Sequence, residues 1–192
     1  MKNLIVFLTL ILTIFLLTNF KDYLVPHQPS ISIKVNPIPI KPIKVLVTQP
    51  ILSLKSHSQF LKDIGFKESG NRYEVVNQYG YMGKYQFGKS TLRTLKIKVT
   101  KYSFLNNPDL QESAMKKNLQ YNKKRLKKYI DKYEGKIIYG ILITESGVLA
   151  AAHLGGSGNV RKFFRKGKVF EDGNGTKITH YMKLFSGYTL NL

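Results

Sequence analysis

The pattern of hydrophobic and polar positions divides the chain into three stretches. Residues 4–20 read LIVFLTLILTIFLLTNF, an almost unbroken apolar run behind a short basic start. As a helix, 17 residues span about 25 Å, the low end for crossing a bilayer. We interpret residues 1–20 as a signal peptide or an uncleaved membrane anchor, and the lack of a small-residue cleavage pair after them slightly favours the anchor. Either interpretation predicts an exported protein.

Prolines mark the second stretch, residues 21–52, which holds six of the seven prolines in the chain. Proline is incompatible with a helix interior and removes a donor from a sheet ladder, so we expect an extended, polyproline-like linker. Alternating residues at 31–35 (ISIKV) also fit an edge strand, and the linker is the interpretation we favour.

The third stretch, residues 53–192, has the periodicity of a globular domain. Apolar residues at helical spacing predict a first helix that runs to about Glu68 and stops at Gly70. Residues 71–87, rich in Gly, Asn and Tyr, suit turns and a small hairpin. Asn107-Pro108-Asp109 is a strong helix start, and Gly135 closes that long helix. Shorter helices are expected over 144–154, 157–165 and 178–185. The predicted fold class is α+β, mainly α, with a small β-hairpin.

Composition and charge narrow the function classes. The chain has 31 Lys+Arg against 11 Asp+Glu, a formal charge of +20, yet only five of the cations are Arg. Sequence-reading nucleic-acid sites favour Arg, so we expect diffuse attraction to an anionic polymer or surface rather than nucleic-acid binding. A compositional bias of the source organism explains the Lys excess equally well. The absence of Cys excludes disulfides, thiolate metal sites and a Cys nucleophile. Four dispersed His without an HExxH motif give no candidate metal site, and no cofactor is expected.

One motif match is misleading. Residues 83–90 (GKYQFGKS) fit the P-loop pattern G-x-x-x-x-G-K-[ST]. A P-loop needs a buried strand before it and small residues whose amides surround phosphate. Here the loop residues are bulky and no convincing apolar strand precedes them, so we do not expect nucleotide binding.

The same region carries a more informative pattern. Residues 67–73 read KESGNRY and residues 76–87 read VNQYGYMGKYQF. Glu-Ser-Gly at a helix end, followed by Asn and a Gly-x-x-Gly-x-Tyr-Gln-Phe segment, resembles the lysozyme-like lytic transglycosylases, which cut the glycan strands of bacterial peptidoglycan. Residues 152–156 (AHLGG) echo a third block, Ala-Tyr-Asn-Ala-Gly, with His153 and Leu154 in place of Tyr and Asn. The resemblance covers roughly residues 54–192.

Elementary chemistry makes Glu68 the candidate catalytic acid. Cleavage of a glycosidic bond needs a carboxylic acid that is still protonated near neutral pH. A Glu in the last turn of a helix faces the negative end of the helix dipole, which disfavours its anion. Glu145 repeats the Glu-Ser-Gly tripeptide at an expected helix start, where Thr144 can cap and the dipole favours the anion. We therefore interpret Glu145 as structural.

The resemblance implies a lysozyme-like fold and cleavage of the β-1,4 bond between N-acetylmuramic acid and N-acetylglucosamine. No acid is an obvious partner for Glu68, which favours lytic transglycosylation with one carboxylate and 1,6-anhydromuramoyl products. Two alternatives stay open: a hydrolase that uses Glu74 or another acid, and a non-catalytic wall-binding protein. The expected location is the cell envelope, periplasmic or membrane-anchored. Candidate substrate-binding residues are Ser69, Asn77, Tyr85, Gln86 and His153.

Overall fold

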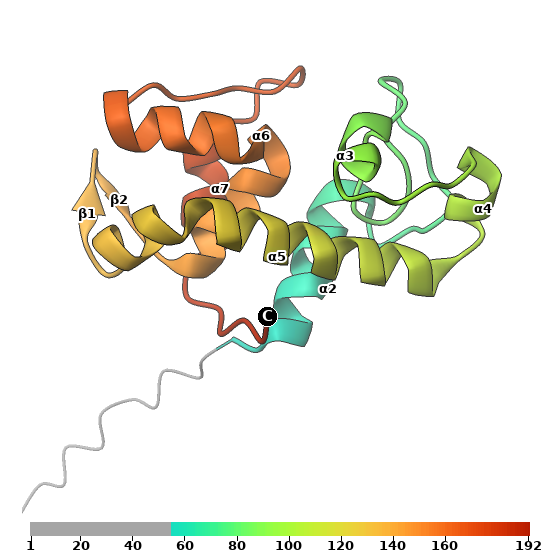
Figure 1. The fold of residues 1–192 in the computed structure, drawn as a ribbon, viewed down its shortest axis with the longest axis horizontal. Coiled ribbons are helices and arrows are strands. Elements are labelled where there is room, and N and C mark those ends of the chain that lie inside the picture. Colours follow the sequence, from blue (N-terminus) through green and yellow to red (C-terminus); the bar gives the residue numbers. More distant parts are fainter. Residues whose placement is uncertain (1–54) are drawn as a thin grey trace, which may run out of the picture. The chain divides into compact units, whose positions relative to one another are not determined.

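The computed structural model describes residues 55–192, which form a mainly helical fold with one two-stranded antiparallel hairpin (Figure 1). The predicted apolar segment 1–20 and linker 21–52 lie outside these residues. Within the described part, no helix combines the length and apolar character needed to cross a membrane. In chain order the elements are α2 (His57–Ser69), α3 (Lys89–Thr94), α4 (Lys101–Leu105), α5 (Pro108–Tyr133), β1 (Ile137–Ile138), β2 (Ile141–Leu142), α6 (Glu145–Lys166) and α7 (Ile178–Leu184).

Helix α2 ends as its sequence predicts. The Ser56 hydroxyl caps its first turn by accepting a hydrogen bond from the Gln59 amide at 3.2 Å. Gly70 follows in the left-handed conformation, with φ 67°, which a glycine adopts without a Cβ clash. Phe60 and Ile64 point into the core and are fully buried. Glu68 therefore stands in the last turn of a helix that is fixed along its apolar face.

Helix α5 is the long axis of the fold and crosses the molecule in Figure 1. The predicted start is confirmed: the Asn107 side chain accepts from the Leu110 amide at 2.9 Å, and Pro108 occupies the first turn. Its apolar face is buried, from Ala114 to Ile130. Figure 1 places α6, α7 and the β1–β2 hairpin around one end of α5, and α3 and α4 around the other.

Helix α6 contains a break that the sequence also predicts. Gly156 has φ 77° and ψ 150°, which divides α6 into two helical segments close to the predicted 144–154 and 157–165. Thr144 caps the start by accepting from the Gly147 amide at 3.2 Å. At Gly147 an added Cβ would lie 2.4 Å from the Met182 carbonyl oxygen. Glycine is therefore required there for α7 to pack closely on α6.

The hairpin prediction for residues 71–87 was wrong in its placement. That segment doubles back twice and makes only isolated bridges, between Val76 and Met82 and between Met82 and Phe87. The two-stranded ladder lies instead at β1–β2, where Ile137 pairs with Leu142. Tyr139 and Gly140 join these strands, both with positive φ (48° and 74°), as a two-residue hairpin loop requires. Helices α3 and α4 were not predicted because five or six residues are too few to show helical periodicity.

Candidate functional site

A cleft of about 630 Å³ opens between the two ends of the fold. Its floor comes from α5 and from the first half of α6, and α3 with residues 77–88 form one wall. Residues 170–174, in the loop between α6 and α7, form the opposite wall. The cleft volume falls in the range of small-ligand sites. Glu68, from the end of α2, lines it.

Glu68 is held by a tyrosine from the far end of the chain. The Tyr181 hydroxyl, on α7, donates to Glu68 Oε1 at 2.8 Å. The Glu68 side chain is 14% exposed and Tyr181 is 2% exposed. Burial raises the pKa of Tyr181, and the Glu68 charge and hydrogen bond raise it further. Tyr181 therefore stays a donor throughout the physiological pH range and fixes one carboxyl oxygen.

His153 faces the same carboxyl group, with Nε2 4.0 Å from Glu68 Oε1. Its own hydrogen bonds determine its protonation. Nε2 lies 2.9 Å from the Tyr85 carbonyl oxygen, which only accepts, so Nε2 carries the proton. Nδ1 lies 2.8 Å from the Asn118 amide nitrogen, which only donates, so Nδ1 accepts. His153 is thus a neutral imidazole, and its approach to Glu68 is not an ion pair.

Sequence reasoning missed the polar floor contributed by α5. Asn118, Tyr121, Asn122 and Arg125 line the cleft at helical spacing, and the first and third are 4% and 3% exposed. The Asn122 amide donates to the Asn118 side-chain oxygen at 3.0 Å, which leaves the Asn118 amide for His153. Arg125 donates to Ser157 at 3.0 Å. The available signal was this polar stripe, repeated every three or four residues within an apolar helix face.

Two of the predicted binding residues line the wall opposite the α6–α7 loop. The Asn77 side-chain oxygen accepts from the amides of Tyr79 and Tyr81, at 2.9 and 3.0 Å, and so shapes the turn between them. Gln86 has φ 49°, and its side-chain amide donates to the Gly83 carbonyl oxygen at 2.9 Å. Both line the cleft, as does His153.

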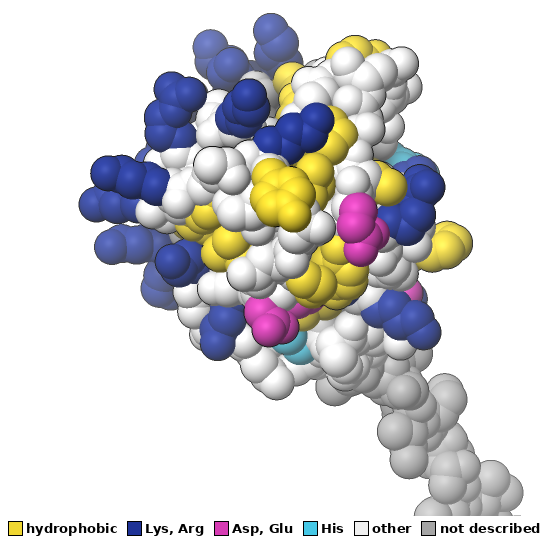
Figure 2. Space-filling model, turned by 90° about the vertical axis from the view of Figure 1, so that its right-hand side faces the viewer, with side chains coloured by type: hydrophobic (Ala, Val, Ile, Leu, Met, Phe, Trp, Pro, Cys, Tyr) yellow, Lys and Arg dark blue, Asp and Glu magenta, His cyan; other side chains and the backbone are white. Residues whose placement is uncertain are grey.

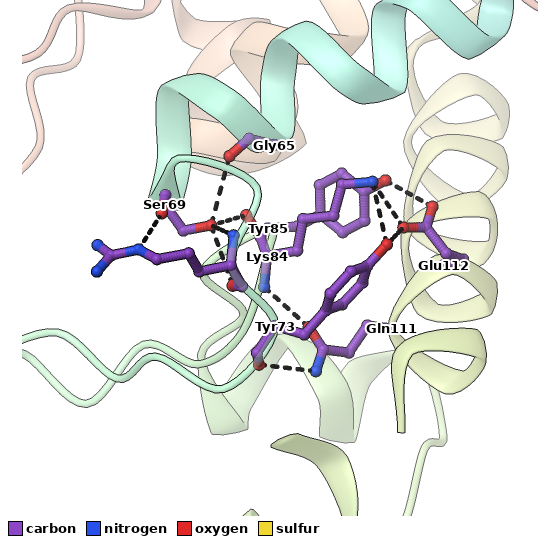
Figure 3. A network of polar contacts seen from close by, with 8 residues as sticks. Gly65, Ser69, Tyr73, Lys84, Tyr85, Gln111 and Glu112 are labelled. Atoms are coloured by element: carbon purple, nitrogen blue, oxygen red, sulfur yellow. Dashed lines mark hydrogen bonds and ion pairs between the residues drawn. The ribbon is translucent and has the colours of Figure 1, made fainter. Parts of the chain in front are cut away.

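Ser69 and Tyr85 are placed differently: neither lines the cleft, and both belong to a buried polar network (Figure 3). The Ser69 hydroxyl donates to the Lys84 carbonyl oxygen at 2.9 Å and accepts from the Arg72 amide at 3.0 Å. Tyr85 is fully buried, and its hydroxyl donates to Glu112 at 2.6 Å. These side chains tie α2, the 71–87 segment and α5 together. Their contribution is to hold the framework around Glu68 and His153.

Glu112 is the ionic centre of that network. Lys84 Nζ lies 2.8 Å from Glu112 Oε1, to which the Tyr73 hydroxyl also donates at 2.7 Å. Burial acts to raise the pKa of Glu112, but the hydrogen bonds from Lys84, Tyr85 and Tyr73, with the Lys84 charge, hold it below its usual value. Burial and Glu112 together raise the pKa of Tyr85. Glu112 is therefore a stable carboxylate that accepts hydrogen bonds from three donors.

The remaining acids are mostly away from the cleft. Glu74 is exposed and does not line it, and Asp63 accepts from the Tyr188 hydroxyl at 2.7 Å. Glu145 begins α6, as predicted, and pairs with Lys123 at 2.9 Å. Asp172 is the other carboxylate that lines the cleft besides Glu68. Within residues 55–192, no three His, Asp or Glu side chains are grouped closely enough to hold a metal ion.

Positive charge gathers around α3, outside the cleft. Between Glu74 and Asp109 the sequence has no acid, and its exposed cations there are Lys89, Arg93, Lys96, Lys98 and Lys101. Figure 2 views the end of the molecule that lies on the right in Figure 1, where α3 and α4 are. Lys and Arg side chains crowd one flank of it, next to exposed hydrophobic groups. These cations line a second hollow together with Leu92, Ile97 and Val99, whereas α3 borders the cleft through Ser90, Thr91 and Thr94.

Comparisons with known proteins add no relative from which to argue. No family model, no curated protein and no solved structure matches this chain. The site itself combines a partly buried Glu68, the Tyr181 donor on its carboxylate, a neutral His153 and a cleft lined with amides and aromatic rings.

Proposed function

We propose that the protein cleaves the β-1,4 bond between N-acetylmuramic acid and N-acetylglucosamine in peptidoglycan, by lytic transglycosylation with Glu68 as the single catalytic carboxyl group. The observation that carries the proposal is the placement of Glu68 in a polar cleft, with Tyr181 2.8 Å from one oxygen and His153 4.0 Å away. The resemblance of residues 67–87 to lytic transglycosylases supports the same assignment. A lysozyme-like fold and export to the cell envelope form part of this proposal.

The reaction needs one group that first donates and then accepts a proton. Glu68 protonates the glycosidic oxygen as the bond from that oxygen to C1 of the muramoyl residue breaks, which releases the N-acetylglucosamine side with a free hydroxyl. The 6-hydroxyl of the same muramoyl residue then attacks C1 and gives its proton to the Glu68 carboxylate. The product is a 1,6-anhydro ring, Glu68 is again protonated, and no water is consumed.

The residues around Glu68 suit these two proton transfers. Tyr181 holds Oε1, so the proposal assigns the proton transfers to Oε2. A neutral His153 places no positive charge beside the carboxyl group, so the protonated form that catalysis needs is not opposed by an adjacent cation. Asn77, Gln86 and Asn122 bring amide groups to the cleft lining, and Tyr121, over whose ring Arg125 lies, brings an aromatic side chain.

A hydrolase is the second candidate, and one observation favours it. Hydrolysis needs a second carboxylate, and Asp172 lines the same cleft as Glu68. Asp172 Oδ1 accepts from the amides of Asn174 and Thr176, at 2.9 and 2.7 Å, which stabilises an anion able to orient water or shield a cation. Glu74, the second acid that the sequence suggested, is exposed and outside the cleft. A hydrolytic mechanism would therefore use Asp172.

The chemistry of the products tests the proposal. Peptidoglycan digested with the full-length protein should carry anhydromuramoyl ends, and the Glu68→Gln variant should produce none. An Asp172→Asn variant separates the two candidates, because transglycosylation needs no second acid and hydrolysis does. Reducing muramic acid ends that disappear in Asp172→Asn would overturn the single-carboxylate mechanism. Binding without cleavage, by a protein shown to be folded, would favour a wall-binding role.

A further inference from the structure

One hydrogen bond joins the two walls of the cleft. The Tyr79 hydroxyl, at the turn of the 77–81 segment, donates to the Gly173 carbonyl oxygen in the α6–α7 loop, at 3.3 Å. Both residues line the cleft, although 94 positions separate them in the chain. In Figure 1 the two segments rise on opposite sides above α5 and extend toward each other.

Each wall holds its own tip in place by backbone hydrogen bonds. On one side the Asn77 side chain accepts from the amides of Tyr79 and Tyr81. On the other, the Asp172 side chain accepts from the amides of Asn174 and Thr176. Turns that are closed by Asn and Asp side chains are rigid relative to loops without them. The two tips are therefore positioned by their own segments. The hydrogen bond between Tyr79 and Gly173 then connects them above the cleft.

Space remains between the two tips beside this hydrogen bond. A Cβ built on Gly173 would lie 3.5 Å from Tyr79 Cζ, an ordinary van der Waals distance, so the gap can take a small side chain. Tyr79 is 52% exposed, so its ring lies at the outer edge of the cleft rather than within its floor.

A ring of protein results around the cleft. Helices α5 and α6 close it below, residues 170–174 close one side, and α3 with residues 77–88 close the other. Among the hydrogen bonds of residues 55–192, the one between Tyr79 and Gly173 joins the two sides and completes the ring. We propose that this contact turns the cleft into a tunnel, so that the substrate is the free end of a glycan strand, which threads past Glu68. This inference rests on the proposed function and specifies its substrate.

If the cleft is a tunnel, the protein should cut glycan strands from their ends. A strand interior cannot enter a closed ring without opening the contact, whereas a free end can be inserted lengthwise. An exposed hydrogen bond shifts an equilibrium by about two- to tenfold. Tyr79→Phe, which keeps the ring and removes the donor, should therefore raise the fraction of interior cuts by about two- to tenfold. Tyr79→Ala, which removes both, should raise it further.

Covalent locking gives the decisive test. The chain has no Cys, so a Tyr79→Cys, Gly173→Cys double variant carries the only two thiols. Gly173 has a negative-φ or extended backbone that accepts a side chain, since it is not among the positive-φ glycines. A short bis-maleimide should join the two thiols in the full-length protein, which mass spectrometry of tryptic peptides detects without any activity measurement. Failure to join them in the folded variant would show that the tips stay apart and would overturn the inference.

Activity of the locked protein then tells how glycan enters. Long purified glycan strands are digested, and early products are sized by chromatography. Small anhydro products from the locked protein, at a rate within about twofold of the unlocked double variant, support threading from an end. Loss of cleavage on locking, or long interior fragments produced by the wild type, would overturn the inference that glycan enters from an end. Either result would leave the proposed function intact. No anhydromuramoyl or reducing ends with the wild type would overturn the proposed function, and the inference with it.

Discussion

Tyr181 on α7 and Glu68 at the end of α2 form a hydrogen bond of 2.8 Å between residues 113 positions apart. Because Tyr181 is buried and its pKa is raised, its hydroxyl remains a donor to Oε1. The contact engages one of the two carboxyl oxygens. It also makes the position of Glu68 depend on how α7 packs against the rest of the fold.

Removal of this donor should impair catalysis more than folding. Tyr181→Phe keeps the buried ring and loses one hydrogen bond to a carboxyl group. A hydrogen bond of this kind contributes about 1.5–3 kcal/mol of free energy. We expect kcat for release of anhydro products to fall about tenfold or more. Tyr188→Phe is the matched control, because Tyr188 donates to Asp63 at 2.7 Å outside the cleft. Equal kcat losses in the two variants would contradict the role of Tyr181.

The neutral state of His153 should depend on Asn118. Asn118→Asp places an acceptor opposite Nδ1, which favours a second proton on the ring while Nε2 still donates to Tyr85. The resulting cation 4.0 Å from Glu68 would favour the carboxylate and deplete the acid. We expect lower activity at neutral pH and an activity profile displaced to lower pH, measured as kcat/KM against pH.

Asn118→Ala is the control for that variant. It leaves Nδ1 without a donor and adds no charge, so stability should fall by about 1–3 kcal/mol in urea unfolding. The shape of its pH profile should match that of the wild type. A displaced profile in Asn118→Ala as well would show that packing, not charge, controls the response.

The Glu112 network should contribute stability that depends on pH. The pKa of Glu112 is lower in the folded state than its ordinary value of 4.5, so the folded protein holds the carboxylate more tightly than the unfolded chain does. Its contribution is therefore complete above about pH 4.5 and is lost as pH falls through the lower, folded-state pKa. Glu112→Gln should lower the free energy of unfolding by about 2 kcal/mol at pH 7, with the deficit shrinking in acid. Exposed Glu74→Gln should show no such deficit.

Binding to the wall should be sensitive to salt and to the charge around α3. Neutralising Lys96, Lys98 and Lys101 with Gln should weaken pull-down on purified anionic wall more than neutralising Lys117, Lys124 and Lys128 on α5. The first set shares the second hollow with Lys89 and Arg93, so it lies where exposed cations are concentrated. Wild-type binding should fall about tenfold between low and high salt as exposed charges are screened. Equal effects of the two sets would mean that only net charge matters.

Local signals in the sequence were sufficient to predict where the longer helices begin, end or break. Gly70, Asn107-Pro108 and Gly156 each act through backbone conformation or capping within a few residues, so the ends of α2 and α5 and the break in α6 were predictable. The placement of Glu68 in a last turn followed from the same signals. Five-residue α4 has a capping box at Thr100 and Ser103, and the β1–β2 ladder has a local turn at Tyr139-Gly140, but elements this short show no periodicity of apolar residues.

The composition of the site was less predictable. Ser69 and Tyr85 adjoin Glu68 and Gln86 in sequence, yet their side chains turn into the buried network, because neighbours along a helix end or a turn point in different directions (Figure 3). Tyr181 and Asp172 reach the Glu68 cleft only through tertiary packing. The α5 stripe around Asn118 was visible as a pattern, but its partner His153 lies on another helix.

The central claim is that Glu68 cuts glycan strands without a second carboxylate. It is tested most directly by mass spectrometry of purified peptidoglycan digested with the full-length protein, beside Glu68→Gln and Asp172→Asn. We predict anhydromuramoyl ends with the wild type, none with Glu68→Gln, and the same anhydro products with Asp172→Asn. Reducing muramic acid ends in the wild-type digest, or unchanged cleavage by Glu68→Gln, would contradict the account.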